Sequence, residues 1–176
     1  MIHFVLGGAR SGKSRFAEQR VAEYAAIGYQ CVYLATASAL DHEMSQRIDQ
    51  HQQDRVSSPH DWTLYEQAYD IAQTLVAIDK PQQVILLDCL TLLLTNHLLV
   101  DDGASWAAQK SLLVDCLSEL QSDVVIVSNE VGSGIVPMDV LNRRFVDEAG
   151  WLNQTIAALS DQVTLVVAGL PLSLKA

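Results

Sequence analysis

The feature that most restricts the fold of this chain is a glycine-rich octapeptide between a short apolar run and a helical pattern. Residues 7–14 read Gly-Gly-Ala-Arg-Ser-Gly-Lys-Ser and match GxxxxGK[ST]. The run Ile2–Leu6 predicts a strand before it, and Lys13–Ala26 predicts a helix after it. In this context the glycines let backbone N–H groups converge on phosphate oxygens, and the helix N-terminus adds partial positive charge. The sequence therefore predicts a phosphate-binding loop rather than a plain strand-to-helix turn.

Two side chains of this loop, and one further along the chain, have expected roles in binding a nucleotide and Mg²⁺. The Lys13 ammonium is expected to reach the β- and γ-phosphates, and the Ser14 hydroxyl to ligate Mg²⁺. Asp88 directly follows the apolar run Ile85–Leu87, as the carboxylate of a Walker B strand does, and is the second expected Mg²⁺ partner. The spacing leaves open the alternative that Asp88 only caps the next helix.

Short apolar runs alternate with helical patterns along the chain. Their apolarity is continuous, which is typical of strands covered on both faces in a parallel sheet. The runs are Ile2–Leu6, Cys31–Thr36, Val84–Asp88, Val124–Ser128 and Val163–Ala168. The helical patterns are Lys13–Ala26, Asp41–Asp54, Ala68–Ile78, Ala104–Leu120 and Val140–Leu159. This order predicts an α/β fold in which helices wrap a mostly parallel sheet.

The segment Asp54–Glu66 breaks this alternation. Its Ser-Ser-Pro sequence predicts a loop, and Trp-Thr-Leu-Tyr at residues 62–65 is compatible with a short edge strand. We therefore expect the chain to leave the regular strand–helix order there.

Length and composition narrow the possible classes of protein. A chain of 176 residues is expected to form one domain, residues 1–176. It has 21 Asp and Glu against 11 Lys and Arg, which argues against general binding to nucleic acid or to anionic membranes. Three cysteines without a CxxC pair favour reduced, buried thiols. The apolar stretch 90–100 is too short for a membrane span, and the N-terminus lacks the features of a signal peptide, so a cytoplasmic protein is expected.

One predicted helix carries a histidine between two arginines. In Asp41–Arg55, the residues Arg47, His51 and Arg55 are spaced four apart and share one helix face. The guanidinium groups could hold phosphate oxygens while a neutral imidazole nitrogen attacks phosphorus. Taken alone, such a stripe is more typical of an ordinary solvated helix face. The other histidines lack this company and are not candidate nucleophiles; they are His3, His42, His60 and His97.

Several separate stretches resemble one family. They are GGARSGKSRFAE, YLATA, DHEMSQRIDQH, DCLTLLLTN, SNEVGSGIVP, RRFVDEAGWLNQ and VVAGLPLSLK. Over nearly the whole chain they resemble the bifunctional adenosylcobinamide kinase/adenosylcobinamide-phosphate guanylyltransferase family of cobalamin biosynthesis. The resemblance implies a RecA-like P-loop NTPase fold and a homotrimer. It also implies that adenosylcobinamide is phosphorylated with ATP or GTP, and that GMP then passes from GTP through a guanylyl-histidine to give adenosylcobinamide-GDP.

The resemblance also implies site residues. It places the guanylylated histidine at His51, with Lys13 as the second catalytic residue. The implied nucleotide contacts are Gly7, Gly8, Ala9, Arg10, Ser11, Gly12, Lys13, Ser14, Ala35, Thr36, Ala37, Gln52, Gln53, Asp54, Arg55, Glu66 and Asp88. The implied partners are adenosylcobinamide, its phosphate, GTP, ATP and Mg²⁺, the last held by Ser14 and Asp88.

Two other functions remain compatible with the phosphate-binding loop alone. A P-loop switch or regulatory ATPase would use the loop to sense nucleotide but would not need a histidine between two arginines. A kinase that had lost guanylyl transfer would keep Lys13 but would not use His51 as a nucleophile. The role of His51 therefore separates the three possibilities.

Overall fold

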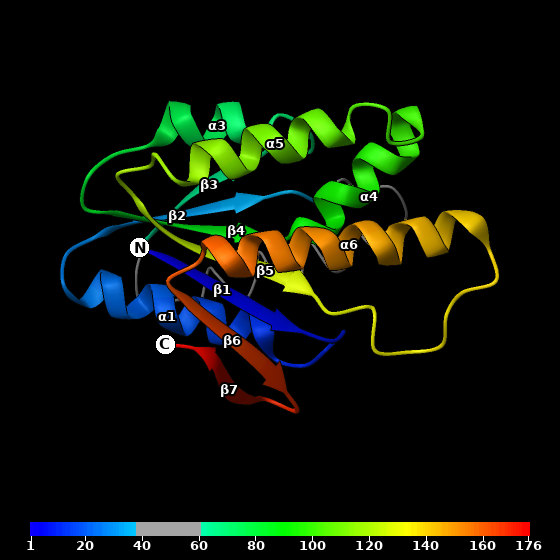
Figure 1. Cartoon of the computed structure of the whole chain (residues 1–176). Helices are drawn as coiled ribbons and strands as arrows, with labels where there is room; N and C mark the ends of the chain where they lie inside the picture. Colours follow the sequence, from blue (N-terminus) through cyan, green and yellow to red (C-terminus); the bar gives the residue numbers. More distant parts are fainter. Residues whose placement is uncertain (38–60) are drawn as a thin grey trace.

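A mixed seven-stranded sheet runs through the part of the chain described by the computed structural model, residues 1–37 and 61–176 (Figure 1). Its strand order is β3-β2-β4-β5-β1-β6-β7, and all neighbours are parallel except β6 and β7. The strands are β1 (Ile2–Gly7), β2 (Gln30–Ala35), β3 (Trp62–Glu66), β4 (Gln83–Asp88), β5 (Asp123–Asn129), β6 (Gln162–Val167) and β7 (Leu170–Lys175).

Helices cover both faces of this sheet. In Figure 1, α1 lies on one side, and α3, α5 and α6 lie on the other. The helices are α1 (Lys13–Ala26), α3 (Ile71–Ile78), α4 (Leu90–Asp101), α5 (Trp106–Leu117) and α6 (Val140–Leu159). Among the described residues, no helix is both long enough and apolar enough to cross a membrane.

The alternation of side chains along the strands divides the core into two clusters. Phe4, Leu34 and Leu87 belong to the cluster packed with α3, α4, α5 and α6. Tyr33 and Leu86 belong to the opposite cluster, which includes the buried face of α1. Because the central strands are buried on both faces, they are apolar at nearly every position. Successive side chains of a strand point to opposite faces of the sheet. Two neighbouring residues at the carboxyl end of a strand therefore face different clusters.

The structure confirms the predicted fold class and most of the predicted elements. Helices α1 and α6 have the predicted bounds, and the five predicted strands differ from the observed ones by one residue at one or both ends. Helices α3 and α5 are shorter than predicted. Residues 62–66 do form an edge strand, so the chain rejoins the sheet there, parallel to β2. The predicted helix Asp41–Asp54 lies outside the described residues.

The last strand, β7, was not predicted. All six of its residues are exposed, so it differs from the continuously apolar, buried strands predicted from the sequence, although Leu170, Leu172 and Leu174 alternate along it. It also contains Pro171, which lacks a backbone N–H but is tolerated in an edge strand.

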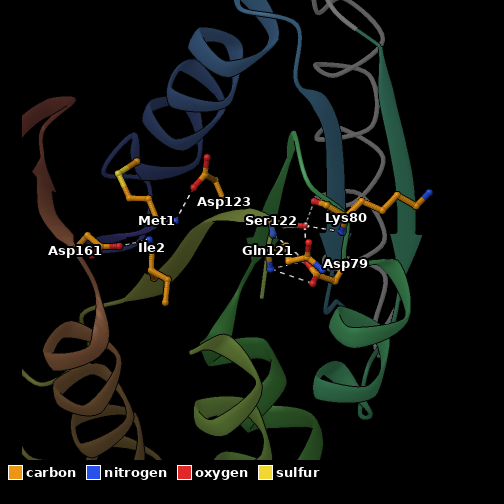
Figure 2. Close-up of polar contacts among 8 residues, drawn as sticks. All are labelled: Met1, Ile2, Asp79, Lys80, Gln121, Ser122, Asp123 and Asp161. Atoms are coloured by element: carbon orange, nitrogen blue, oxygen red, sulfur yellow. Dashed lines mark hydrogen bonds and ion pairs between the residues drawn. The ribbon is translucent and has the colours of Figure 1, made fainter. Parts of the chain in front are cut away.

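At the amino end of the sheet, short polar contacts join segments distant in the sequence (Figure 2). The Met1 ammonium lies 2.6 Å from Asp123 Oδ1, and the Ile2 N–H donates to Asp161 at 2.6 Å. Asp79, which follows α3, accepts from the backbone N–H groups of Gln121 and Ser122 and from the Ser122 hydroxyl. The loop before β4 is thereby tied to the loop before β5.

These contacts set the ionisation of Asp79. Burial alone would raise the pKa of its carboxyl group, but the hydrogen bonds from Gln121, Ser122 and Lys80 together outweigh burial and lower the pKa. A carboxyl group whose pKa is lower in the folded chain stabilises the fold above its unfolded pKa, and this contribution is lost as the pH falls through the folded pKa.

We therefore predict that Asp79→Asn weakens the fold at neutral pH, because an amide places donors against N–H groups. The loss in free energy of unfolding at pH 7 should be about 1–3 kcal/mol, and the variant should lose less stability than wild type on acidification below about pH 4. Urea unfolding of the variant and of wild type, at pH 7 and below about pH 4, measures these differences in the free energy of unfolding. The matched control is Asp147→Asn on the exposed side of α6. Equal effects of the two substitutions at pH 7 would contradict the assigned role of Asp79.

Candidate functional site

The predicted site residues in the described part of the chain converge at the carboxyl edge of the sheet. Gly7 ends β1 and Asp88 ends β4, with β5 between these two strands. Ala35 ends β2, and Glu66 ends β3 beside it. In a parallel sheet the carboxyl ends of all strands share one edge, which is where open α/β sheets bind ligands. The remaining predicted residues, His51 and Gln52–Arg55, lie outside the described residues.

The phosphate-binding loop has the local geometry that its sequence requires. Gly12 is the N-cap residue of α1 and has φ +94°, a left-handed conformation that glycine adopts without a steric penalty. Arg10 also has a positive φ, at 57°. Lys13 and Ser14 form the first turn of α1, and Lys13 Nζ donates to the Gly8 carbonyl oxygen at 3.3 Å. The Lys13 ammonium is therefore held over the loop at the amino end of the helix.

The turn between β6 and β7 supports the loop from outside. The Gly169 N–H donates to the Ser11 carbonyl oxygen at 2.8 Å. A Cβ atom on Gly12 would lie 3.2 Å from the Cα atom of Gly169, so the two backbones are in close contact. This tail carries part of the family resemblance, but no role was predicted for it. A glycine between two apolar runs is the sequence signal that could have predicted the turn, but only the fold brings this glycine against residues 11 and 12.

The Asp88 side chain is hydrogen-bonded across the sheet. Its Oδ2 accepts from the Tyr33 hydroxyl of β2 at 2.9 Å. The N-cap residue of α4 is Cys89, so the alternative that Asp88 caps this helix is wrong. The Asp88–Cys89 peptide bond is cis. Asp88 shares the α1 side of the sheet with Leu86, two residues earlier, which places its carboxylate on the side from which Lys13 and Ser14 begin α1.

The charges at this edge act on the thiol of Cys89, which is buried next to Asp88. Burial, followed by the charge of Asp88, raises the pKa of the Cys89 thiol to about 11, while Lys13 is among the groups that lower it. The oxygen donors of Ser14 and Asp88 are of the type that Mg²⁺ prefers. The residues at this edge therefore fit a magnesium-bound nucleoside triphosphate.

A buried polar network connects the ends of β2, β4 and β5. Thr36 Oγ1 donates to the Cys89 carbonyl oxygen at 2.7 Å and accepts from the Cys89 N–H at 2.9 Å. The Asn96 amide, from α4, donates to the Thr36 carbonyl oxygen at 2.8 Å. Asn129 donates to Thr91 Oγ1 at 3.0 Å. Thr36 is fully buried and acts in this network, whereas Ala35 and Ala37 flank it with partial exposure.

The two histidines among the described residues, His3 and His97, are buried and contact the hydroxyl groups of other side chains. His3 Nε2 lies 2.9 Å from Thr164 Oγ1, and burial together with Arg20 lowers the pKa of the imidazole. His97 is buried on α4, with Nδ1 2.9 Å from Ser105 Oγ. Neither lies at the end of a strand beside the loop. The sequence analysis did not consider either histidine a candidate nucleophile, and their positions agree with this prediction.

The chain is similar over nearly its whole length to known proteins. A protein-family model described as cobinamide kinase / cobinamide phosphate guanyltransferase matches residues 3–174. The bifunctional adenosylcobalamin biosynthesis protein CobP of Pseudomonas aeruginosa is 47% identical over 175 residues, covering 99% of this chain and 98% of that protein. The bifunctional adenosylcobalamin biosynthesis protein CobU of Escherichia coli K12 is 39% identical over 190 residues, covering 99% and 100%.

Solved structures support the fold. A KaiC-like protein from Pyrococcus horikoshii superposes with a TM-score of 0.51 at 12% identity, covering 93% of this chain and 69% of that one. The flagellar accessory protein FlaH from Methanocaldococcus jannaschii superposes with a TM-score of 0.51 at 12% identity, covering 99% and 77%. At these identities the likeness concerns the fold alone, which is of the RecA-like type.

The packing around the loop generates a test with two adjacent glycines. A Cβ atom on Gly7 would lie 2.6 Å from the Val166 carbonyl oxygen and 2.4 Å from Ser11 Oγ, whereas one on Gly8 meets nothing within 4 Å. Gly7→Ala should therefore lower the free energy of unfolding by about 1–3 kcal/mol, and Gly8→Ala by less than about 0.5 kcal/mol. Chemical denaturation of both variants measures this. Equal stability of the two would contradict the close packing of the loop on β6.

Proposed function

The chain belongs to the cobinamide kinase/cobinamide phosphate guanyltransferase family, and on this basis we propose that one nucleotide site at the carboxyl edge of the sheet serves both reactions. The protein is a bifunctional cobinamide kinase and cobinamide phosphate guanylyltransferase of adenosylcobalamin biosynthesis. The alternative of a nucleotide switch or regulatory ATPase is set aside. We also propose that residues 1–176 act as one domain, because strands from Ile2 to Lys175 belong to a single sheet.

In the kinase step, the loop residues Gly7–Ser14 hold ATP or GTP by their backbone N–H groups. The substrate hydroxyl oxygen forms a bond to the γ-phosphorus and loses its proton, while the bond from that phosphorus to the β–γ bridging oxygen breaks and the nucleoside diphosphate leaves. The Lys13 ammonium stabilises negative charge on the transferred group. The observation that carries this assignment is that Lys13, whose ammonium donates to the Gly8 carbonyl oxygen at 3.3 Å, begins α1 at the same edge of the sheet where Asp88 ends β4.

Ser14 and Asp88 are the proposed magnesium partners. Bound Mg²⁺ neutralises charge on the phosphates and orients them for in-line transfer. Ser14 is the second residue of α1, directly after Lys13, and carries a hydroxyl, while Asp88 supplies carboxyl oxygens at the end of β4. Ala35, Thr36, Ala37 and Glu66 lie at the ends of the neighbouring strands β2 and β3, and we propose that they line the nucleotide site on that side.

In the guanylyltransferase step, His51 is the proposed nucleophile. A neutral imidazole nitrogen forms a bond to the α-phosphorus of GTP, the bond to the α–β bridging oxygen breaks, and pyrophosphate leaves. An oxygen of cobinamide phosphate then attacks the same phosphorus and releases the imidazole. Arg47 or Arg55, each four positions away in the sequence, stabilises the charge. The support for this step is the spacing of these residues together with the family membership.

We predict that GTP labelled at the α-phosphate leaves a covalent GMP adduct on His51, detectable by peptide mapping after denaturation. The adduct should survive alkali and be lost in acid, because protonation makes the imidazole a better leaving group. His51→Ala should lose the adduct and guanylyl transfer but keep cobinamide phosphorylation, whereas Lys13→Ala should lose both reactions.

His42→Ala and His60→Ala are the matched controls for this experiment. Both should retain the adduct and both reactions. An adduct mapped to either of these histidines, or full guanylyl transfer by His51→Ala, would show that the nucleophile is placed wrongly.

We further propose that the chain forms a homotrimer. The resemblance to the family is the first reason, and the apolar helix α4 is a second. Of its residues Leu92, Leu93, Leu98 and Leu99, however, Leu93 and Leu98 are only 2% and 5% exposed and belong to the core. The surface that remains is at Leu99, which is 59% exposed and lines a groove of about 220 Å³ between α4 and α6 with Leu141 and Phe145. Contact with another copy would cover this apolar surface.

Light scattering at micromolar concentration should therefore give three times the monomer mass of 19.3 kDa. Leu99→Glu should shift the mass towards the monomer, because a charge would be buried without a partner. Glu119 lies on the exposed surface after α5, and Glu119→Gln should leave the mass unchanged. A monomer mass for the unmodified protein would contradict the proposal.

A further inference from the structure

A row of side chains crosses three strands on the α1 side of the sheet. Trp62 of β3, Tyr33 of β2 and Asp88 of β4 come from segments widely separated in the sequence. The Trp62 and Tyr33 rings meet edge to face, with centroids 5.7 Å apart and an interplanar angle of 80°. The Tyr33 hydroxyl donates to Asp88 Oδ2 at 2.9 Å. The row ends at the carboxylate assigned above to the magnesium site.

The register of the sheet explains why these side chains meet. Tyr33 pairs with Leu86 on β4, and Asp88 is two residues further along the same face. Diagonal neighbours at this separation are beyond the reach of short side chains but within the reach of aromatic ones. On the other side, Trp62 pairs with Cys31, two residues before Tyr33. The Tyr33 side chain therefore lies between Trp62 of β3 and Asp88 of β4, and its ring packs against the Trp62 ring.

In the hydrogen bond between Tyr33 and Asp88, the Tyr33 hydroxyl is the donor and the carboxylate is the acceptor. Tyr33 is only 3% exposed, so its hydroxyl is withdrawn from solvent. An ionised carboxylate only accepts hydrogen bonds, so the phenol is the donor. Within residues 1–37 and 61–176, Asp88 Oδ1 has no hydrogen-bond partner. One carboxylate oxygen is thus engaged by the protein, and the other is available to a ligand.

From this geometry we propose that Tyr33 is a positioning residue for the metal-dependent reactions, because it holds Asp88 Oδ2 and so directs Oδ1 to the cation. The inference rests on the proposed role of Asp88 in binding Mg²⁺. A partner that orients a metal-binding carboxylate typically changes metal affinity or activity about 10–100-fold when removed. Tyr33 touches neither nucleotide nor cobinamide in this scheme, and its effect passes through the orientation of Asp88.

The test measures metal binding directly, without turnover. Mn²⁺ is titrated into the full-length protein saturated with the α,β-methylene analogue of GTP, without cobinamide, and free Mn²⁺ is followed by electron paramagnetic resonance. The variants are Tyr33→Phe, Asp88→Asn and the double variant. Tyr33→Phe removes one oxygen and keeps the ring against Trp62. The matched control is Tyr24→Phe, near the carboxyl end of α1, away from the loop.

We expect Tyr33→Phe to weaken Mn²⁺ binding about tenfold, with no change in the affinity for the analogue in EDTA. In the Asp88→Asn background the same substitution should have no further effect, because the carboxylate on which it acts is gone. Tyr24→Phe should bind Mn²⁺ as wild type does.

Three other outcomes overturn the inference in distinguishable ways. If Asp88→Asn weakens Mn²⁺ binding but Tyr33→Phe behaves like Tyr24→Phe, the positioning role is wrong and the proposed role of Asp88 stands. If Asp88→Asn binds Mn²⁺ as wild type does, the metal role of Asp88 is wrong, and the role of Tyr33 is wrong with it. A lower unfolding temperature of Tyr33→Phe with unchanged Mn²⁺ binding would assign the hydrogen bond to stability alone.

Discussion

The parallel pairing of the central strands is the constraint on which the site depends. Because β2, β4, β5 and β1 run in the same direction and in register, Ala35 lies opposite Asp88, and Gly7 lies opposite Asn129. Groups that are far apart in the sequence are thereby brought to one edge of the sheet. Burial of these strands on both faces makes a shift of register costly, because a shift by one residue would exchange the two faces of a strand. The stability of the core and the geometry of the site therefore have the same origin.

The phosphate-binding loop is held by structure on both sides. On one side Gly7 packs so closely on β6 that a Cβ atom would contact the Val166 carbonyl oxygen. On the other side the turn between β6 and β7 donates a hydrogen bond from Gly169 to Ser11. The strand β7 contributes no buried residue to the core, yet its turn supports the loop, and Lys175 at its end donates to the Ala158 and Ser160 carbonyl oxygens at the end of α6. This exposed hairpin therefore links the loop to the last helix.

The carboxyl edge of the sheet combines a charged surface with a buried polar support. Lys13 and Asp88 are partly exposed, as groups that contact a soluble ligand must be. Behind them, Thr36 and Cys89 exchange two hydrogen bonds that join the ends of β2 and β4. Tyr33 adds a third connection between these strands, directed at Asp88 itself. A buried network whose members are hydrogen-bonded to one another limits the movement of the groups it carries, which suits a site that orients phosphates for transfer.

The sequence by itself determined the fold class, nearly all the strands, the bounds of α1 and α6, and the phosphate-binding loop with Lys13 and Ser14. These features are local, because apolar periodicity and a short motif depend on residues adjacent in the chain. The sequence left open whether Asp88 caps α4, and it gave no role to Tyr33 or Gly169. Only the tertiary structure decided these, since the Tyr33–Asp88 hydrogen bond spans 55 positions and depends on the diagonal register of β2 and β4. The exposed strand β7 also needed the fold, because Leu170, Leu172 and Leu174 alternate as in a strand but Pro171 argues against one, and the pairing with β6 decides between these readings.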